Sequence, residues 1–458
     1  MSNPFSKIDG GLPLYPVHSD NLDQWLEDAP GNQRKWLKDS GFSAQPGELC
    51  SLPDGNGELH GFVFGMQNSG WLYQLAALPA KLAPDDYELI ADWQPEQRLQ
   101  ASLGWGLACY QFNLYRKSSK EMPRLVLDED FASRARQLYS AQSLVRDLIN
   151  TPTEDMGPLH LADAMQAQAD ELGAHMTVVH GKDLLTENFP AIHAVGRASD
   201  REPRLLKMEW GQPQDPLLAL CGKGVCFDTG GLNLKPAAGM RVMKKDMGGA
   251  AHVLALARLI IEAQLPVRLM VLIPAVENSV AGNAYRPGDV IATRKGLSIE
   301  IGNTDAEGRV VLADALAYAC EYEPDLVMDF ATLTGAARIA MGTDLPPVFS
   351  NDIDIANALV AAGEQEEDPL WAFPLYQPYN ELIKSPIADL SNVGTTSYGG
   401  CITAALFLEH FVNEETDWVH IDTFGWNQAA RPGRPAGGEA LGLRASFNYL
   451  KTRYKQDL

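Results

Sequence analysis

The chain has 458 residues, 45% of them hydrophobic, which is enough for two or more domains with a sizeable core. Its 37 basic and 59 acidic residues give a net charge of -22, which disfavours nucleic acid as a general partner because phosphate binding needs a basic face. Six cysteines do not make a disulfide scaffold in a chain of this length, and the most apolar window, 253–276, is broken by charged residues and proline, so we expect a cytoplasmic protein without a membrane span.

The first part of the chain, residues 1–124, mixes short strand, turn and helix patterns. Residues 57–66 and 71–78 have the composition of strands, and residues 95–116 have that of a helix. The polar stretch 117–124 is typical of a linker. We therefore predict a smaller N-terminal α/β domain over 1–124 and a larger catalytic domain over 125–458.

The second part of the chain alternates strand and helix patterns, beginning with a predicted helix over 130–149. Such alternation favours an α/β fold in which a central mixed sheet is covered by helices on both faces. The predicted strands cover residues 204–210, 216–221, 267–274, 297–302, 325–330 and 418–423.

Polar residues cluster on the glycine-rich loops that follow the strand predicted at 216–221. They are Lys223, Asp228, Lys235 and Asp246, and a helix-like repeat follows from Ala250. Open α/β sheets bind ligands at this edge. A phosphate loop is disfavoured because no Gly-Lys-Ser/Thr sequence opens a helix, and a dinucleotide site is disfavoured because the G-x-G-x-x-G pattern is absent.

A second polar cluster precedes the apolar helical pattern at 310–316. Asp305, Glu307 and Arg309 stand at alternate positions, and alternate residues share one side of an extended segment. Two carboxylates and a guanidinium at one point indicate a metal site with an anion-binding neighbour. The alternative is an ordinary helix start with Asn303 or Thr304 as N-cap.

The motifs GKGVCFDTGG, LKPAAGM, KDMGGA and NTDAEGR follow one another between residues 222 and 309. In order and spacing they resemble the motifs of the leucyl aminopeptidase family, the hexameric cytosol aminopeptidases of peptidase family M17. The resemblance runs from about Leu144 to the C-terminus. Two details differ from the commonest pattern: Thr229 replaces serine, and residues 241–245 are more basic than usual, which bears on substrate preference.

The resemblance implies two metal ions and one bound bicarbonate. Lys235 would be the catalytic lysine near the substrate carbonyl, and Arg309 would be catalytic by holding the bicarbonate. The first ion would be bound by Asp228, Asp305 and Glu307, and the second by Lys223, Asp228, Asp246 and Glu307.

The ligand chemistry agrees with this assignment. Four carboxylates without histidine or cysteine suit manganese or magnesium, and zinc tolerates them; we expect Mn²⁺ or Zn²⁺, with Mg²⁺ or Co²⁺ as further candidates. Lys223 must be neutral to bind an ion, because an ammonium group has no lone pair.

The resemblance also implies residues that contact the substrate. Met243 would line the pocket for the first side chain, although a core methionine is an equally ordinary explanation. Thr332, Leu333 and Gly335 would line the peptide, although they could also form an ordinary turn after the strand at 325–330.

The expected function is removal of the N-terminal residue from peptides through attack by a metal-bridging hydroxide, with a preference for large apolar first residues. The expected assembly is a homohexamer. Two alternatives remain open: a metal-dependent dipeptidase such as a Cys-Gly hydrolase, and a non-catalytic DNA-binding or structural member.

Overall fold

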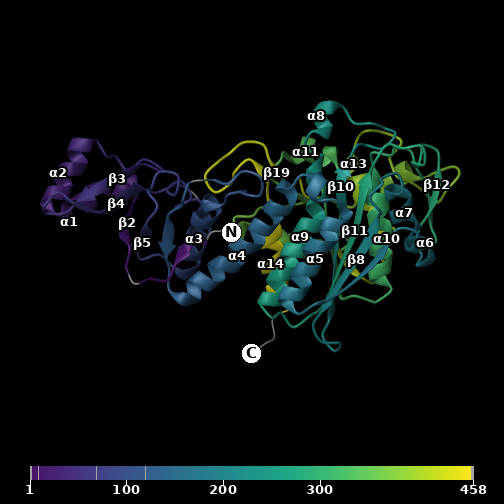
Figure 1. Ribbon diagram of the computed structural model, residues 1–458, viewed down its shortest axis with the longest axis horizontal. Coiled ribbons are helices and arrows are strands. Elements are labelled where there is room, and N and C mark those ends of the chain that lie inside the picture. Colours follow the sequence, from purple (N-terminus) through teal and green to yellow (C-terminus); the bar gives the residue numbers. More distant parts are fainter. Residues whose placement is uncertain (1–2, 9, 69, 119, 455–458) are drawn as a thin grey trace. The chain divides into compact units, whose positions relative to one another are not determined.

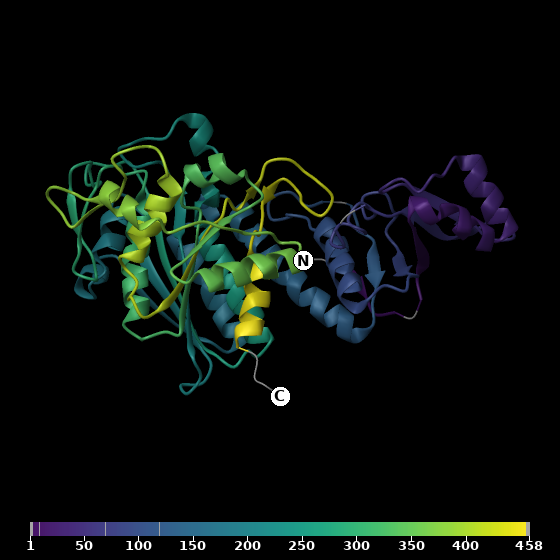
Figure 2. The same ribbon diagram turned by 180° about the vertical axis from the view of Figure 1, so that it is seen from behind.

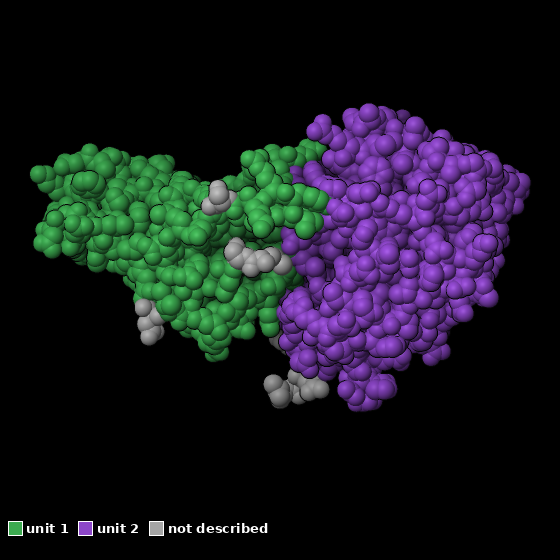
Figure 3. Space-filling model, in the orientation of Figure 1, with its two compact units in different colours: residues 1–143, 428–436 green, residues 144–427, 437–458 purple. Residues whose placement is uncertain are grey.

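The computed structural model describes residues 3–454 except 9, 69 and 119 (Figure 1). The chain forms two compact units, which Figure 3 distinguishes by colour. Unit 1 comprises residues 1–143 and 428–436, and unit 2 comprises residues 144–427 and 437–458. The domain boundary predicted at 124/125 stays a prediction.

Unit 1 is built on a six-stranded sheet with the strand order β1-β6-β5-β2-β4-β3. Its largest core cluster surrounds Trp105, which is fully buried. The elements are β1 (Phe5–Ser6), β2 (Leu12–Val17), α1 (Leu22–Asp28), α2 (Gly31–Ser40), β3 (Leu49–Pro53), β4 (Leu59–Gly65), β5 (Asp86–Leu89), α3 (Pro95–Cys109), β6 (Arg124–Val126) and the start of α4 (Glu129–Asn150).

The strand predicted at 71–78 is wrong, because this segment forms consecutive turns. Leu72, Leu75, Ala76 and Leu78 are buried, but the Leu78 amide bonds to the Leu75 carbonyl within the segment. The predicted helix at 95–116 ends at Cys109, where Tyr110 adopts an extended conformation. The predicted linker has little regular structure before β6, and Ser119 within it lies outside the described residues.

Unit 2 contains a nine-stranded mixed sheet with the order β16-β15-β18-β14-β9-β11-β8-β7, and β10 pairs with β11. The elements are α5 (Pro158–Leu172), β7 (His175–His180), α6 (Asp183–Thr186), α7 (Pro190–Gly196), β8 (Arg204–Trp210), β9 (Leu217–Gly222), β10 (Gly224–Asp228), α8 (Ala237–Met240), α9 (Gly248–Glu262), β11 (Arg268–Asn278), β12 (Val290–Ala292), β13 (Ser298–Glu300), α10 (Glu307–Cys320), β14 (Leu326–Ala331), α11 (Gly335–Met341), β15 (Pro347–Ser350), α12 (Ile353–Gln365), β16 (Trp371–Ala372), β17 (Leu390–Ser391), α13 (Gly400–Glu409), β18 (Asp417–Asp422), β19 (Trp426–Asn427), β20 (Gly437–Gly438) and α14 (Leu443–Arg453).

The predicted α/β architecture with helices on both faces is confirmed. Helix α9 packs on β9 and β14 beside α5 and α14, whereas α10 packs on β9 and β11 beside α7 and α13 (Figures 1 and 2). Strands β9 and β14 are buried along their whole length, as expected for central strands covered on both faces. All six strands predicted between 204 and 423 are present, as β8, β9, β11, β13, β14 and β18. Within the described residues, no helix is both long enough and apolar enough to cross a bilayer.

Candidate metal centre

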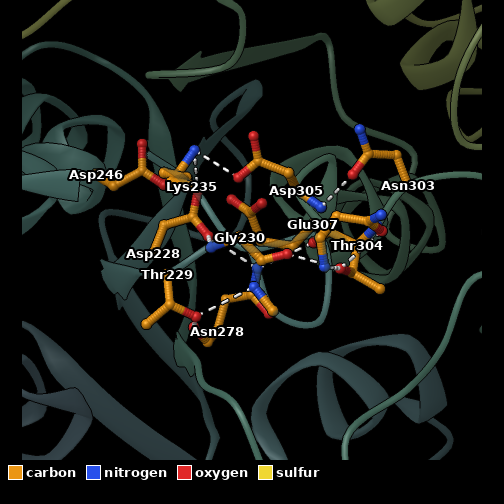
Figure 4. A network of polar contacts seen from close by, with 12 residues as sticks. Asp228, Thr229, Gly230, Lys235, Asp246, Asn278, Asn303, Thr304, Asp305 and Glu307 are labelled. Atoms are coloured by element: carbon orange, nitrogen blue, oxygen red, sulfur yellow. Dashed lines mark hydrogen bonds and ion pairs between the residues drawn. The ribbon is translucent and has the colours of Figure 1, made fainter. Parts of the chain in front are cut away.

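The two polar clusters of the sequence meet at one edge of the central sheet (Figure 4). Lys223 separates β9 from β10, and Asp228 is the last residue of β10. Asp246 lies in a short 3-10 helix, η3 (Met243–Met247), immediately before α9. Glu307 is the first residue of α10. These ligand candidates therefore come from the end of β10, from the turns beside β9 and α9, and from the first residue of α10.

Three carboxylates form the centre of the site. Asp228, Asp305 and Glu307 each place an oxygen within 4.8 Å of the others. Asp228 and Glu307 are buried, whereas Asp305 is half-buried. Carboxylates at this spacing repel one another unless cations lie between them. The centre is therefore suited to binding cations.

Two lysines supply part of that positive charge. Lys223 Nζ lies 2.7 Å from Asp246 Oδ2 and 2.9 Å from Glu307 Oε1. Lys235 Nζ lies 2.8 Å from Asp228 Oδ2 and 2.5 Å from Asp305 Oδ1. Lys223 thus connects Asp246 to the three-carboxylate centre. Lys235 pairs with Asp228 and with the half-buried Asp305.

The pKa values show how strongly the groups interact. Burial, reinforced by Asp228, raises the pKa of Glu307 to about 8, and burial together with Asp246 raises that of Asp228 to about 6. Burial opposes the charge on Lys223, but the surrounding carboxylates outweigh it and raise its pKa well above the ordinary value. Without metal, the site therefore retains protons that divalent ions would displace.

Neutral partners fix the carboxylate of Asp228. The Gly230 amide and Asn278 Nδ2 each donate to Asp228 Oδ1 at 2.8 Å. Asn278 also donates to the Thr304 carbonyl at 3.0 Å, so it joins the two motif segments. Asn278 was absent from the predicted site; the available signal was a polar residue ending the apolar run of β11.

A glycine in the second motif makes room for Lys223. A methyl group at Gly308 would lie 2.5 Å from Lys223 Cε and 2.8 Å from Nζ. The lysine side chain therefore passes directly over the first turn of α10. This close approach explains why glycine, rather than a residue with a side chain, stands between Glu307 and Arg309.

Arg309 lies differently from what the sequence pattern predicted. Glu307 and Arg309 lie within α10, so alternate positions do not share a side, and the argument from an extended segment is wrong. Arg309 is buried and donates through Nη1 to the Asn392 carbonyl at 2.7 Å. Its Nε has no hydrogen-bond partner among the described residues. The N-cap of α10 is Ala306 rather than Asn303 or Thr304, so the helix-cap alternative is also wrong.

A cavity of about 180 Å³ adjoins the carboxylates. Met243, Thr332, Leu333 and Gly335 line it together with Lys223, Asp228, Lys235, Asp246 and Asp305. The structure thus brings every predicted site residue except Glu307 and Arg309 to the wall of one cavity. Glu307 belongs to the same centre through its contacts with Lys223 and the other carboxylates.

The loop after β14 is held by Asp422, which the sequence analysis missed. Asp422 Oδ1 accepts from the Leu333 amide at 2.9 Å, and Oδ2 accepts from Thr334 Oγ1 at 2.6 Å. Thr332 Oγ1 donates to Asp246 Oδ1 at 2.8 Å. The loop is therefore fixed between the carboxylate site and the end of β18.

The fold and the site define a class: an α/β protein with an oxygen-rich acidic cluster that could bind metal, placed at a sheet edge beside a residue-sized cavity. Comparison with known proteins identifies the family. Residues 143–446 match the catalytic domain of the cytosol aminopeptidase family, and residues 12–128 match the M17 aminopeptidase N-terminal domain. The chain belongs to this family of metal-dependent hydrolases.

Individual relatives agree with the family match. A probable cytosol aminopeptidase of Syntrophotalea carbinolica is 42% identical over 75% of this chain and 73% of its own. The crystal structure of the cytosol aminopeptidase from Coxiella burnetii is 48% identical, with a TM-score of 0.96 over 98% of this chain and 99% of its own. The bottromycin maturation enzyme BotP in complex with Mn is 30% identical, with a TM-score of 0.87 over 97% of this chain and 99% of its own.

Proposed function

We propose that this protein is a dinuclear metalloaminopeptidase that releases the first residue of peptides. The observation that carries the proposal is the cluster of Asp228, Asp305 and Glu307, whose oxygens lie within 4.8 Å of one another at the wall of a cavity the size of one residue. The family match supports the reaction class.

The donor set fits divalent ions. Glu307 Oε2 is buried and has no hydrogen-bond partner within the described part of the chain, which leaves it available to an ion. The first ion would be held by Asp228, Asp305 and Glu307, and the second by Lys223, Asp228, Asp246 and Glu307. Mn²⁺ and Zn²⁺ are the leading candidates, followed by Mg²⁺ and Co²⁺, and the manganese complex of BotP supports Mn²⁺. When bound, the ions supply Lewis acidity for the scissile carbonyl, a place for the free α-amine and a lowered pKa for water.

The chain's own residues supply the remaining chemistry. Lys235 Nζ faces the cavity beside Asp228 and Asp305, where its charge would stabilise negative charge that develops on the carbonyl oxygen. Thr332, Leu333 and Gly335 would position the peptide along the loop that Asp422 holds. Met243 would contact the first side chain.

Arg309 would hold a bicarbonate ion. Its buried guanidinium retains an unpartnered Nε, and a planar oxyanion can accept two parallel hydrogen bonds from arginine. Every carboxylate of the two motifs is assigned to a metal ion, so none remains to accept a proton. A bicarbonate at Arg309 would provide that acceptor.

The remaining expectations rest on the resemblance and, for the location and the nucleic-acid partner, on composition and net charge. They are the homohexamer, the cytoplasmic location, the preference for large apolar first residues, and the absence of a nucleic-acid partner. The relatives named as cytosol aminopeptidases support the location.

Blocking the substrate amine tests the proposal. Leucine amide, N-acetyl-leucine amide and the dipeptide Cys-Gly would be compared with metal-loaded enzyme. We expect acetylation to lower kcat/KM by at least about 10²-fold, because the blocked amine can no longer position the carbonyl. Equal turnover of blocked and free amides would contradict an aminopeptidase. Turnover of Cys-Gly alone would favour the dipeptidase, and inactivity on all three would favour a non-catalytic member.

A further inference from the structure

The substrate cavity contains a cation that neither metal binding nor carbonyl activation uses. Lys245 lies in η3 between Met243 and Asp246, and it lines the cavity although its side chain is only 5% exposed. Within the described residues, its Nζ donates no hydrogen bond, and its only ion pair is a 3.8 Å contact with Asp246 Oδ1. A buried ammonium group in this state lacks the direct hydrogen bonds that normally stabilise buried charge.

The neighbouring carboxylates are already engaged. Asp246 Oδ1 accepts from Thr332 Oγ1, and its Oδ2 lies 2.7 Å from Lys223 Nζ. Asp422 accepts from the Leu333 amide and from Thr334. Neither carboxylate forms a hydrogen bond with Lys245, whose Nζ lies 3.8 Å from Asp246 Oδ1, so the ammonium group at the cavity wall keeps unused donors.

A second cation lies at the same wall. The Lys245 ammonium lies 5.0 Å from the centre of the Phe424 ring, and the Arg338 guanidinium lies 4.7 Å from the centre of that ring. Phe424 and Arg338 both line the cavity. Arg338 is exposed and Lys245 is buried. The two positive side chains therefore line the cavity from its interior to its solvent-exposed side.

Position and size restrict what can neutralise these cations. A cavity of about 150 Å³ holds a benzene-sized group, so about 180 Å³ accepts one side chain of moderate size. The same cavity is lined by Asp228, Asp305 and Lys235, where the amine and carbonyl of the first residue would lie. The side chain attached between those two groups would therefore share this cavity with Lys245.

We propose that Lys245, assisted by Arg338, selects peptides whose first residue is acidic, glutamate or aspartate. This inference rests on the proposed aminopeptidase function and replaces the expected apolar preference. A leucine side chain would cover the Lys245 ammonium without offering an acceptor, whereas a carboxylate supplies a charge-assisted hydrogen bond.

Isosteric substrates test the inference. The p-nitroanilides of glutamate, glutamine and leucine would be compared with metal-loaded full-length enzyme, using the ratio of kcat/KM for glutamate to that for glutamine. We expect this ratio to exceed about tenfold in the wild type, the range for a hydrogen bond to a charged group. Lys245→Met should reduce the ratio to near one. Lys244→Met is the matched control, since Lys244 Nζ instead donates to the Asn150 carbonyl, and it should keep the wild-type ratio.

Several outcomes would overturn the inference. A wild-type ratio near one, with leucine turned over normally, would refute the acidic preference and leave the aminopeptidase intact. An unchanged ratio in Lys245→Met would also refute it. If Lys245→Met fails to fold, Arg338→Gln, at an exposed position, should still lower the ratio, and the wild-type ratio remains decisive. Absence of turnover on all three substrates would overturn the proposed function and this inference together.

Discussion

Lys223 Nζ lies 2.9 Å from Glu307 Oε1, so the lysine of the first motif is bound to the first residue of α10 in the second. The same nitrogen lies 2.7 Å from Asp246 Oδ2 and donates to the Thr332 carbonyl at 3.1 Å. One ammonium group therefore connects the residue after β9 to η3, to α10 and to the loop after β14. Without metal, it is the main buried counter-charge to Asp246 and Glu307.

Replacing Lys223 by methionine should destabilise the metal-free protein. Removing one partner of a buried ion pair leaves uncompensated charge and costs about 3–5 kcal/mol. Urea unfolding in excess chelator would measure the change. Lys384→Met, which removes the exposed pair with Glu381, is the control and should change the free energy of unfolding by less than about 1 kcal/mol. Equal effects of the two substitutions would contradict the role given to Lys223.

Adding a methyl group at Gly308 should weaken metal binding. The methyl would lie 2.5 Å from Lys223 Cε, and such overpacking costs about 1–3 kcal/mol, so we expect an affinity loss of about fivefold to a hundredfold. Calorimetric titration with Mn²⁺ would measure it. Gly239→Ala is the control, because a methyl there meets no atom within 4 Å. Normal Mn²⁺ affinity in Gly308→Ala would show that metal binding does not depend on the close packing of Lys223 over Gly308.

Removing the Arg309 guanidinium should impair catalysis without removing metal. We expect Arg309→Ala to lower kcat by about 10- to 10³-fold, the range for losing a base or a charge stabiliser, while metal content stays normal by elemental analysis. Added bicarbonate should stimulate depleted wild-type enzyme and stimulate the variant much less. If bicarbonate depletion leaves wild-type kcat unchanged across pH, another group must be the proton acceptor.

His252 should make folding stability sensitive to mild acid. Its neutral ring is satisfied, with Nδ1 2.6 Å from the Gly248 carbonyl and Nε2 accepting from the Leu441 amide at 3.0 Å. Burial lowers the pKa of His252 below its ordinary value of 6.5, so the unfolded state binds a proton first. The stability that it contributes is present above pH 6.5 and is lost as the pH falls toward the folded-state pKa.

The pH effect is measurable by denaturation at several pH values. The free energy of unfolding should fall by up to about 1.4 kcal/mol per pH unit below pH 6.5 because of this group. His252→Gln should remove that part of the slope, and His60→Gln, at an exposed position, should retain it. An identical slope in His252→Gln and the wild type would contradict the assignment.

Hydrophobic periodicity predicted the strands of the larger unit well, because each strand pattern is contained in a few neighbouring residues. Residues 217–221 lie in β9 as predicted, since a short apolar run followed by a glycine-rich loop gives a strand in a buried sheet. Residues 71–78 are also largely apolar but form turns, in which Gln74 bonds to the backbone of Gln67 and Gly70. Composition alone does not distinguish a buried strand from buried turns.

The supporting shell of the site could not be predicted from local patterns. Asn278, Asn392 and Asp422 act across large sequence separations, bonding to Asp228, Arg309 and Leu333 respectively. Their positions depend on which strand ends meet in the folded sheet. Lys245 was visible only as extra basic charge, and its burial in the substrate cavity required the structure.

Metal stoichiometry measured together with activity tests the central claim most directly. Metal-free protein, verified by elemental analysis, would be titrated with Mn²⁺ while bound metal and leucine amide hydrolysis are followed in the same samples. We expect no activity without metal, full activity at two ions per chain, and a stoichiometry nearer one for Asp246→Asn, because Asp246 is assigned to the second ion alone. Full activity in the metal-free protein would contradict the account.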